Sequence, residues 1–207
     1  MKTITTIDFD IIMGPSIDGY NDMIDPPRND MDTICEKFPY FNFAKPNLWL
    51  YEYLTRYIAE VAMKTDNIKF ITSHEQIVDI LSDEDEQFNL VNIDHHHDVN
   101  YRDEWKEPII EVNSGNWVKK LLDTGNINHY TWVGNHNSII FDVSSCPYMD
   151  KIDIEKIKDY DLGKLAAETN ELILCYSPAY IPPDYRALFM IWRAIVEEIH
   201  DKDYTLI

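Results

Sequence analysis

The chain of 207 residues is poor in glycine, in long apolar runs and in basic side chains, and each shortage excludes something. With 6 glycines and no Ser/Gly-rich linker, a single domain over residues 1–207 is expected. No apolar run approaches the roughly 18 residues that a membrane helix needs, which argues against a membrane-spanning segment. The opening MKTITTIDFD has no apolar signal core, so a soluble, cytoplasmic protein is expected.

Cysteine is scarce as well. The chain has Cys35, Cys146 and Cys175, which are widely spaced and form no CxxC pair. Their odd number and their spacing favour buried, reduced thiols.

Basic residues are outnumbered by acidic ones, 18 against 37, which gives a formal net charge of −19. This balance argues against a nucleic-acid partner, because nucleic-acid affinity depends on Lys and Arg that displace counterions from phosphates. It is compatible with a solvated acidic surface, a cationic ligand or bound metal ions that offset part of the charge. An acidic chain can also imitate nucleic acid and occupy a DNA-binding enzyme.

The chain does contain the material for a core, since 45% of its residues are hydrophobic and 13% are aromatic. Strands are expected at residues 3–9, 68–72, 88–93, 138–143 and 172–176, and helices at residues 48–63, 75–81, 117–122 and 182–200. Short apolar strands that alternate with helices predict an α/β fold, with a mostly parallel sheet covered on both faces. Such an arrangement is a three-layer sandwich.

The densest chemical motif directly follows the expected strand 88–93 and reads Asp94-His95-His96-His97-Asp98. Alternate side chains of an extended segment point the same way, so Asp94, His96 and Asp98 can converge while His95 and His97 face the other side. Two carboxylates that flank an imidazole are typical of a metal site, because a cation offsets the cost of burying their charge. The alternative is a solvated polar loop, or a histidine cluster that binds metal adventitiously.

Two further motifs lie at the ends of expected strands. Asp8 and Asp10 end the strand at 3–9, and His74 follows the strand at 68–72. Taken singly, the aspartates could cap or solvate a strand end, and the histidine could be a cap or a surface residue. In a parallel sheet, however, the carboxyl ends of the strands share one edge, which would bring these side chains to residues 94–98.

The combined set of candidate ligands is Asp8, Asp10, His74, Asp94, His96 and Asp98. Oxygen and nitrogen ligands without a thiolate favour Mn²⁺ over a structural Zn²⁺ site, although Fe²⁺, Co²⁺ or Zn²⁺ could also bind. So many carboxylates suit two divalent cations about 3.5–4 Å apart that share bridging carboxylates.

These motifs resemble those of the arginase/deacetylase superfamily. Residues 94–98 are similar to its Asp-x-His-x-Asp signature. Residues 6–10, with Pro15 shortly after, are similar to its Ser-x-Asp-x-Asp…Pro motif, and Ser73-His74 to the histidine of its Gly-Asp-His-Ser motif. The resemblance implies an arginase-like fold.

The resemblance also implies how two ions would be held. Asp8 and Asp94 would bridge them. His74 and Asp98 would complete the ligands of one ion, and Asp10 and His96 would complete those of the other.

The order of the motifs differs from that of arginases. There the Asp-x-Asp segment follows the Asp-x-His-x-Asp signature, whereas here it comes first. The resemblance is therefore to a permuted or rearranged variant, similar to a small uncharacterised family of arginase-like proteins. The expected strand at 172–176 ends without aspartates, which supports the N-terminal pair as their replacement.

The function implied by the resemblance is hydrolysis of a C–N bond in a guanidino, amidine or acyl-amine substrate through a metal-bridging hydroxide. A leaving amine needs a proton donor, and the candidate catalytic residues are His97, His129 and His136. Residues His129 and His136 flank a segment interpreted as an aromatic, Asn-rich loop. Three polar residues lie where arginase relatives contact substrate: Asn113, Ser114 and Asn116.

Two alternatives come from other functional classes. The same fold and metal site could serve binding or stability without turnover, which predicts tightly held metal with no open coordination position. The chain could instead be an acidic nucleic-acid mimic with incidental Asp and His motifs, which predicts exposed acidic residues spaced like phosphates and no need for metal. The sequence alone does not determine the substrate, the native metal or the oligomeric state.

Overall fold

Strand β1 (Thr3–Asp8) lies inside the sheet with a neighbour on each side, and its sequence TITTID suits that position. β-Branched residues pack well on the two faces of a buried parallel strand.

The computed structural model describes residues 1–13, 45–82, 84, 86–99, 109–135, 138, 146–178 and 181–201.

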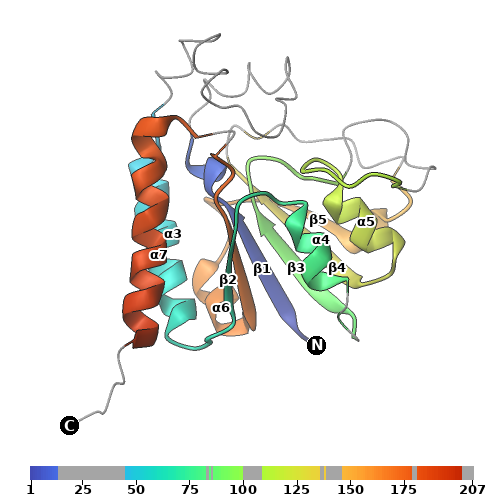
Figure 1. Ribbon diagram of the computed structural model, residues 1–207. Helices are drawn as coiled ribbons and strands as arrows, with labels where there is room; N and C mark the ends of the chain where they lie inside the picture. Colours follow the sequence, from blue (N-terminus) through green and yellow to red (C-terminus); the bar gives the residue numbers. More distant parts are fainter. Residues whose placement is uncertain are drawn as a thin grey trace.

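The sheet has six strands in the order β2-β6-β1-β3-β4-β5, and every neighbouring pair is parallel (Figure 1). The other strands are β2 (Ile68–Ile71), β3 (Phe88–Ile93), β4 (Ile127–Gly134), β5 (Ile152–Lys156) and β6 (Glu171–Cys175). Because all pairs are parallel, the strands point the same way, and their carboxyl ends lie together at one end of the sheet.

Helices cover both faces of the sheet (Figure 1). On one face lie α3 (Leu48–Ala62), α6 (Leu162–Glu168) and α7 (Arg186–Asp201), and on the other lie α4 (Gln76–Leu81) and α5 (Trp117–Asp123). Strand side chains alternate between the faces, so Ile4 packs in the core with α4 and α5, while Ile7 packs in the core with α3, α6 and α7. The sheet thus separates two hydrophobic layers.

The chain leaves β1 and β3 toward opposite edges of the sheet. Strand β1 connects through α3 to the edge strand β2, whereas β3 connects through α5 to β4. The two strands are neighbours, with Ile7 opposite Ile93. Their carboxyl ends therefore form a topological switch point, the place where parallel α/β proteins usually bind their ligands.

The predicted α/β fold with a parallel sheet is confirmed. Four of the expected strands correspond to β1, β2, β3 and β6, and the four expected helices correspond to α3, α4, α5 and α7. The last of these helices is preceded by a 3-10 turn, η6 (Pro183–Tyr185), so α7 itself begins later than expected. Residues 139–143 of the expected strand at 138–143, and Pro15, lie outside the described residues.

One interpretation of the sequence was wrong. The segment interpreted as an aromatic, Asn-rich loop is strand β4, which lies between β3 and β5. Its sequence INHYTWVG is rich in β-branched and aromatic residues, which pack well on a pleated surface, and this preference outweighs its polar residues. Strand β5 and helix α6 are absent from the predicted elements.

A membrane-spanning helix is also absent from the described part of the chain, where no helix is both long enough and apolar enough to cross a bilayer.

Candidate metal centre

The carboxyl end of β1 carries two buried aspartates. Asp8 ends the strand and caps the 3-10 helix η1 (Phe9–Ile12), because its Oδ1 accepts a hydrogen bond from the Asp10 N–H at 3.2 Å. The exposed fraction is 5% for Asp8 and 2% for Asp10. Among the described residues, neither carboxylate oxygen of Asp10 receives a hydrogen bond of good geometry. Burying two adjacent carboxylates in this way costs free energy unless positive charge compensates them.

The segment after β3 contributes Asp94 and Asp98, and the surrounding protein fixes both. Asp94 Oδ1 accepts a hydrogen bond from the His96 N–H at 3.0 Å, and its Oδ2 accepts one from Asn92 Nδ2 at 3.2 Å. Trp117, the first residue of α5, donates from Nε1 to Asp98 Oδ2 at 2.7 Å. Both carboxylates are therefore held in place by the fold itself.

His74 lies in the turn between β2 and α4. Gln76 fixes this turn, since its Oε1 accepts hydrogen bonds from two backbone N–H groups at 2.9 and 3.1 Å. The Nδ1 atom of His74 lies 3.3, 3.1 and 3.0 Å from the Oδ2 atoms of Asp8, Asp94 and Asp98, respectively. Its Nε2 atom is buried and has no hydrogen-bond partner among the described residues.

His96 approaches the carboxylates from the other side of Asp94. Its Nδ1 lies 3.2 Å from Asp10 Oδ2 and 4.0 Å from Asp94 Oδ1. The side chain of His96 is 23% exposed, whereas those of Asp10 and Asp94 are each 1% exposed. Of these three side chains, His96 is thus the one that reaches the surface of the protein.

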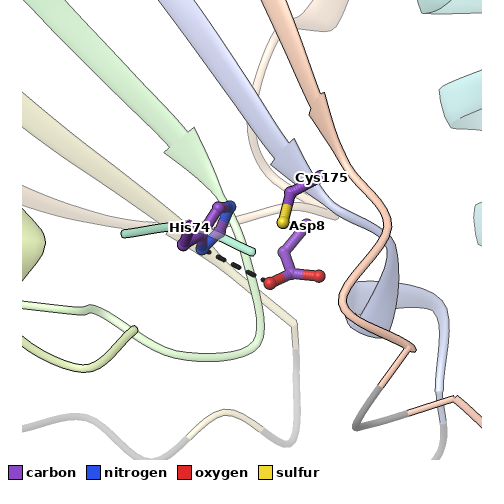
Figure 2. A group of neighbouring side chains, drawn as sticks. All are labelled: Asp8, His74 and Cys175. Carbon is purple, nitrogen blue, oxygen red and sulfur yellow. Dashed lines mark ion pairs between the residues drawn. The ribbon is translucent and has the colours of Figure 1, made fainter. Parts of the chain in front are cut away.

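Three overlapping groups of these side chains could hold a metal ion. They are Asp10, Asp94 and His96; His74, Asp94 and Asp98; and Asp8, His74 and Cys175 (Figure 2). Within each group, one ligand atom from each residue lies within 4.8 Å of the others. Asp94 belongs to two of the groups. The structure therefore brings together all six side chains that the sequence analysis proposes as ligands.

Two residues at the centre have a backbone conformation that side chains rarely adopt. The torsion angle φ is 52° at Asp98 and 42° at Ser177, the two non-glycine residues with positive φ in the described part of the chain. Such conformations cost roughly 1–3 kcal/mol each, and the surrounding structure has to enforce them. Their presence at one place is typical of a functional site.

In the absence of a cation, the two imidazoles carry positive charge. Burial alone would lower the pKa of His96, but the Asp10 carboxylate 3.2 Å away outweighs burial and raises this pKa to about 10. Burial would likewise lower the pKa of His74, but its neighbours, Cys175 and Asp8 first among them, raise it well above its usual value. The protons on these two rings thus supply the positive charge that a bound divalent cation would otherwise provide to the carboxylates.

The carboxylates respond to the same environment in opposite ways. Burial, reinforced by repulsion from Asp94, raises the pKa of Asp98 to about 8. Burial and the charge of Asp10 raise the pKa of Asp8. Burial acts in the same direction on Asp94, but the two imidazoles outweigh it and lower the pKa of Asp94 below its usual range. The shared carboxylate therefore stays charged.

Two residues of the centre, Cys175 and Ser177, are absent from the ligands predicted from the sequence. Asp8 is opposite Cys175 in the register of β1 and β6. The Ser177 hydroxyl donates to Asp8 Oδ2 at 2.6 Å and lies 3.2 Å from the Cys175 sulfur. The only signal in the sequence is their position at the end of an expected strand, and it becomes informative once β6 is known to lie beside β1.

No family model, curated protein or solved structure matches this chain. The donor set of the centre itself fits a divalent cation. Asp10 and His74 have buried polar atoms without hydrogen-bond partners in the described part of the chain, and four buried carboxylates point into one small volume. Oxygen and imidazole ligands in this number suit a divalent first-row metal.

His97 is the candidate proton donor next to the ligands in the sequence. Its side chain is buried, its Nδ1 accepts a hydrogen bond from the Val99 N–H at 3.1 Å, and its ring packs 5.8 Å from that of Trp132. Burial, with repulsion from His96, lowers the pKa of His97 to about 3, so the ring is neutral near pH 7. A neutral imidazole that accepts at Nδ1 carries its proton on Nε2.

The structure does not bring His129 to the centre. His129 pairs with Asn89 near the start of β4 and β3, whereas the ligands follow the carboxyl ends of β1 and β3. Its Nε2 lies 2.8 Å from Asp153 Oδ2 in an exposed pair. The prediction of a catalytic role for His129 is therefore corrected, because the segment is a strand that carries this residue away from the site. His136 lies outside the described residues.

The candidate substrate residues Asn113, Ser114 and Asn116 form the turn before α5. Asn116 Oδ1 accepts from the Asn113 N–H at 2.8 Å, Asn113 Oδ1 accepts from the Gly115 N–H at 2.9 Å, and Asn116 Nδ2 donates to the Glu111 carbonyl at 3.1 Å. These bonds order the turn that leads into Trp117 and so help to place Asp98. A role in substrate contact stays a prediction.

Proposed function

We propose that this chain is a metal-dependent hydrolase of the arginase/deacetylase type, with the three-layer fold of that superfamily. It would cleave a C–N bond in a guanidino, amidine or acyl-amine substrate. The observation that carries the proposal is the position of Asp94. Its buried carboxylate belongs both to a group with His74 and to a group with His96, as expected for a carboxylate shared by two ions.

The proposed ligands combine these groups with the bridging role of Asp8 that the resemblance to arginases implies. One ion would be held by His74, Asp94, Asp98 and Asp8, and the other by His96, Asp94, Asp8 and Asp10. Mn²⁺ is the first choice for such oxygen-rich sites, with Fe²⁺, Co²⁺ or Zn²⁺ as substitutes. When bound, the cations would lower the pKa of a water molecule and stabilise negative charge that develops on the substrate.

The residues of the chain would perform the other tasks. Asn92 and Trp117 orient the Asp94 and Asp98 carboxylates through hydrogen bonds. The partial exposure of His96 gives a small molecule access to the centre from that side. His97 would contact the leaving group by a hydrogen bond from Nε2 rather than by releasing a proton, because its ring is neutral near pH 7.

The two alternatives differ from this proposal in what they require. A nucleic-acid mimic has no use for the four carboxylates of Asp8, Asp10, Asp94 and Asp98, which are buried beside two imidazoles. A metal site that only stabilises the fold has its coordination positions filled by protein ligands and leaves none for a substrate, so turnover by the metal-loaded protein separates this alternative from the hydrolase.

The first experiment is the metal content of protein purified without chelator. We expect about two equivalents of Mn²⁺ or a similar ion per wild-type chain, and loss of both in Asp94→Ala, because this carboxylate would bridge the ions. The matched control is Glu171→Gln, which removes a buried carboxylate at the start of β6 and should leave the metal content unchanged.

Loaded protein is then assayed against guanidino, amidine and acyl-amine compounds. Turnover that disappears in Asp94→Ala and persists in Glu171→Gln would support the hydrolase. Two bound ions without turnover would favour a metal-binding protein. A wild-type chain that cannot be loaded with Mn²⁺, Zn²⁺ or Fe²⁺ would end the proposal and favour an acidic interaction protein.

A further inference from the structure

Strands β1 and β6 place a carboxylate and a thiol side by side. Asp8 and Cys175 are opposite each other in the parallel register, so their side chains leave the sheet on the same face. Figure 2 shows the Cys175 sulfur, the Asp8 carboxylate and the His74 imidazole gathered at one point, and a ligand atom from each lies within 4.8 Å of the others. Cys175 is fully buried in this position.

The His74 side chain is an independent sign that a ligand belongs here. It is 2% exposed, and its Nε2 has no hydrogen-bond partner among the described residues. A buried polar atom without a partner costs about 1–3 kcal/mol, so native structures rarely keep one without a reason. A bound cation would satisfy a ring nitrogen of His74 and the Asp8 carboxylate together.

We propose that Asp8, His74 and Cys175 form a metal position of their own, which takes a thiophilic divalent cation such as Zn²⁺, Co²⁺ or Cd²⁺ through the Cys175 sulfur. Thiolate ligands select softer ions, while the carboxylates around Asp94 suit harder ones such as Mn²⁺. When the ion binds, the S–H bond of Cys175 breaks, its proton passes to solvent and a metal–sulfur bond forms. The inference goes beyond the proposed function, because this ion would be held whether or not the centre hydrolyses anything.

The two kinds of position compete for His74. A neutral imidazole offers one lone pair, so His74 can bind an ion together with Cys175 or an ion together with Asp94 and Asp98, but not both. The kind of ion that binds would therefore determine which of the two positions is occupied. A soft ion would occupy the sulfur position and reduce binding of Mn²⁺ at the carboxylate position.

The test uses the ultraviolet charge-transfer absorption of a metal–thiolate bond. Full-length protein treated with chelator is titrated with Cd²⁺ and, separately, with Co²⁺. We expect wild type to develop the band with one sulfur per ion, and Cys175→Ser to lose it. Cys146→Ser is the matched control, because Cys146 is also a buried free cysteine but packs in the hydrophobic core with α5.

A second variant keeps the test decisive if Cys175→Ser does not fold. The double substitution Cys35→Ser/Cys146→Ser leaves Cys175 as the single cysteine of the chain and should keep the full band. A wild-type chain that binds Cd²⁺ without the band would overturn the proposal, and so would a band that survives in Cys175→Ser or disappears in the double variant.

The outcomes also separate this inference from the proposed function. Two equivalents of Mn²⁺ without any thiolate band would remove the sulfur position and leave the hydrolase in place. A thiolate band in a chain that takes up no Mn²⁺ would do the opposite.

Discussion

Asn92 connects the shared carboxylate of the centre to the middle of the sheet. Its Nδ2 donates to Asp94 Oδ2 at 3.2 Å, and its Oδ1 accepts from Thr6 Oγ1 at 2.5 Å. Asn92 is fully buried, so these bonds have no competition from water. A neighbour of this kind sets the direction of a metal ligand without touching the metal.

We expect Asn92→Ala to weaken Mn²⁺ binding about 10- to 100-fold, because the Asp94 carboxylate loses the group that orients it. The affinity is measured by competition with a chelator of known affinity. Asn128→Ala is the control, since its amide bonds Asn89 at 3.0 Å at the other end of the sheet. Equal affinities in wild type and Asn92→Ala would show that Asp94 does not need this support.

Asp8 is expected to stabilise the protein only when metal is bound. Its pKa in the folded chain is raised by burial and by Asp10, so the metal-free fold loses stability as the pH rises from the unfolded value of 3.8 through the folded pKa. We expect Asp8→Asn to raise the free energy of unfolding in chelator near pH 7, by on the order of 1 kcal/mol, and to weaken metal binding. Urea denaturation in chelator measures the first effect. A large loss of stability there would contradict the assignment of Asp8 as a ligand whose burial a bound cation compensates.

At the scale of the elements, β6 carries Glu171, a buried carboxylate outside the metal centre. Two lysine side chains of the protein compensate its charge. Glu171 lies 2.7 Å from Lys2 Nζ and 2.5 Å from Lys69 Nζ. Burial would raise the pKa of Glu171, but the hydrogen bonds and charges of the two lysines outweigh burial and lower it. The start of β6 is thereby tied to Lys2, which precedes β1, and to Lys69 of β2.

We expect Glu171→Gln to lower the free energy of unfolding by roughly 2 kcal/mol near pH 7, since charged hydrogen bonds are lost. Because the folded pKa is depressed, this stabilisation is complete above the unfolded value of 4.5 and disappears as the pH falls through the folded pKa. The stability curves of wild type and variant should therefore converge in acid. Curves that stay parallel down to low pH would contradict the role assigned to the two lysines.

The success of sequence-based prediction also differs from element to element. β1 and β3 are recognisable because each is a short apolar run that ends in aspartates, and those aspartates proved to be neighbours. β4 is not apparent from the sequence, because its polar residues interrupt the apolar pattern of a strand. It forms a strand because it pairs with β3 on one side and with β5 on the other. The part played by Ser177 could not be predicted either, since it bonds Asp8 across 169 positions of sequence and depends on strand order.

At the scale of the whole molecule, the centre lies where the two hydrophobic layers and the sheet meet. Asp8 ends β1, whose Ile7 packs with α3 and α7, while Trp117 of α5 holds Asp98 from the opposite face. Ions bound here would therefore connect both layers, and their binding free energy would add to the stability of the entire fold. The formal net charge of −19 should also attract cations toward the chain.

We expect Mn²⁺ at 100 times its dissociation constant to stabilise the chain by about 2.7 kcal/mol, which raises the Tm by roughly 5–10 °C for a domain of this size. Differential scanning calorimetry with added Mn²⁺ or added chelator measures the shift. The Asp94→Ala variant should show none. A wild-type Tm that is identical in both buffers would argue against any metal centre in this chain.

The left-handed backbone at Asp98 and Ser177 has a consequence for attempts to evolve the protein in the laboratory. A library selected for heat resistance in the presence of chelator should accumulate glycine at these two positions, because glycine adopts positive φ without strain. It should also accumulate neutral residues at Asp8. The same library selected in the presence of Mn²⁺ should keep all three. The substitutions that separate the two populations would map the functional centre without any knowledge of the substrate.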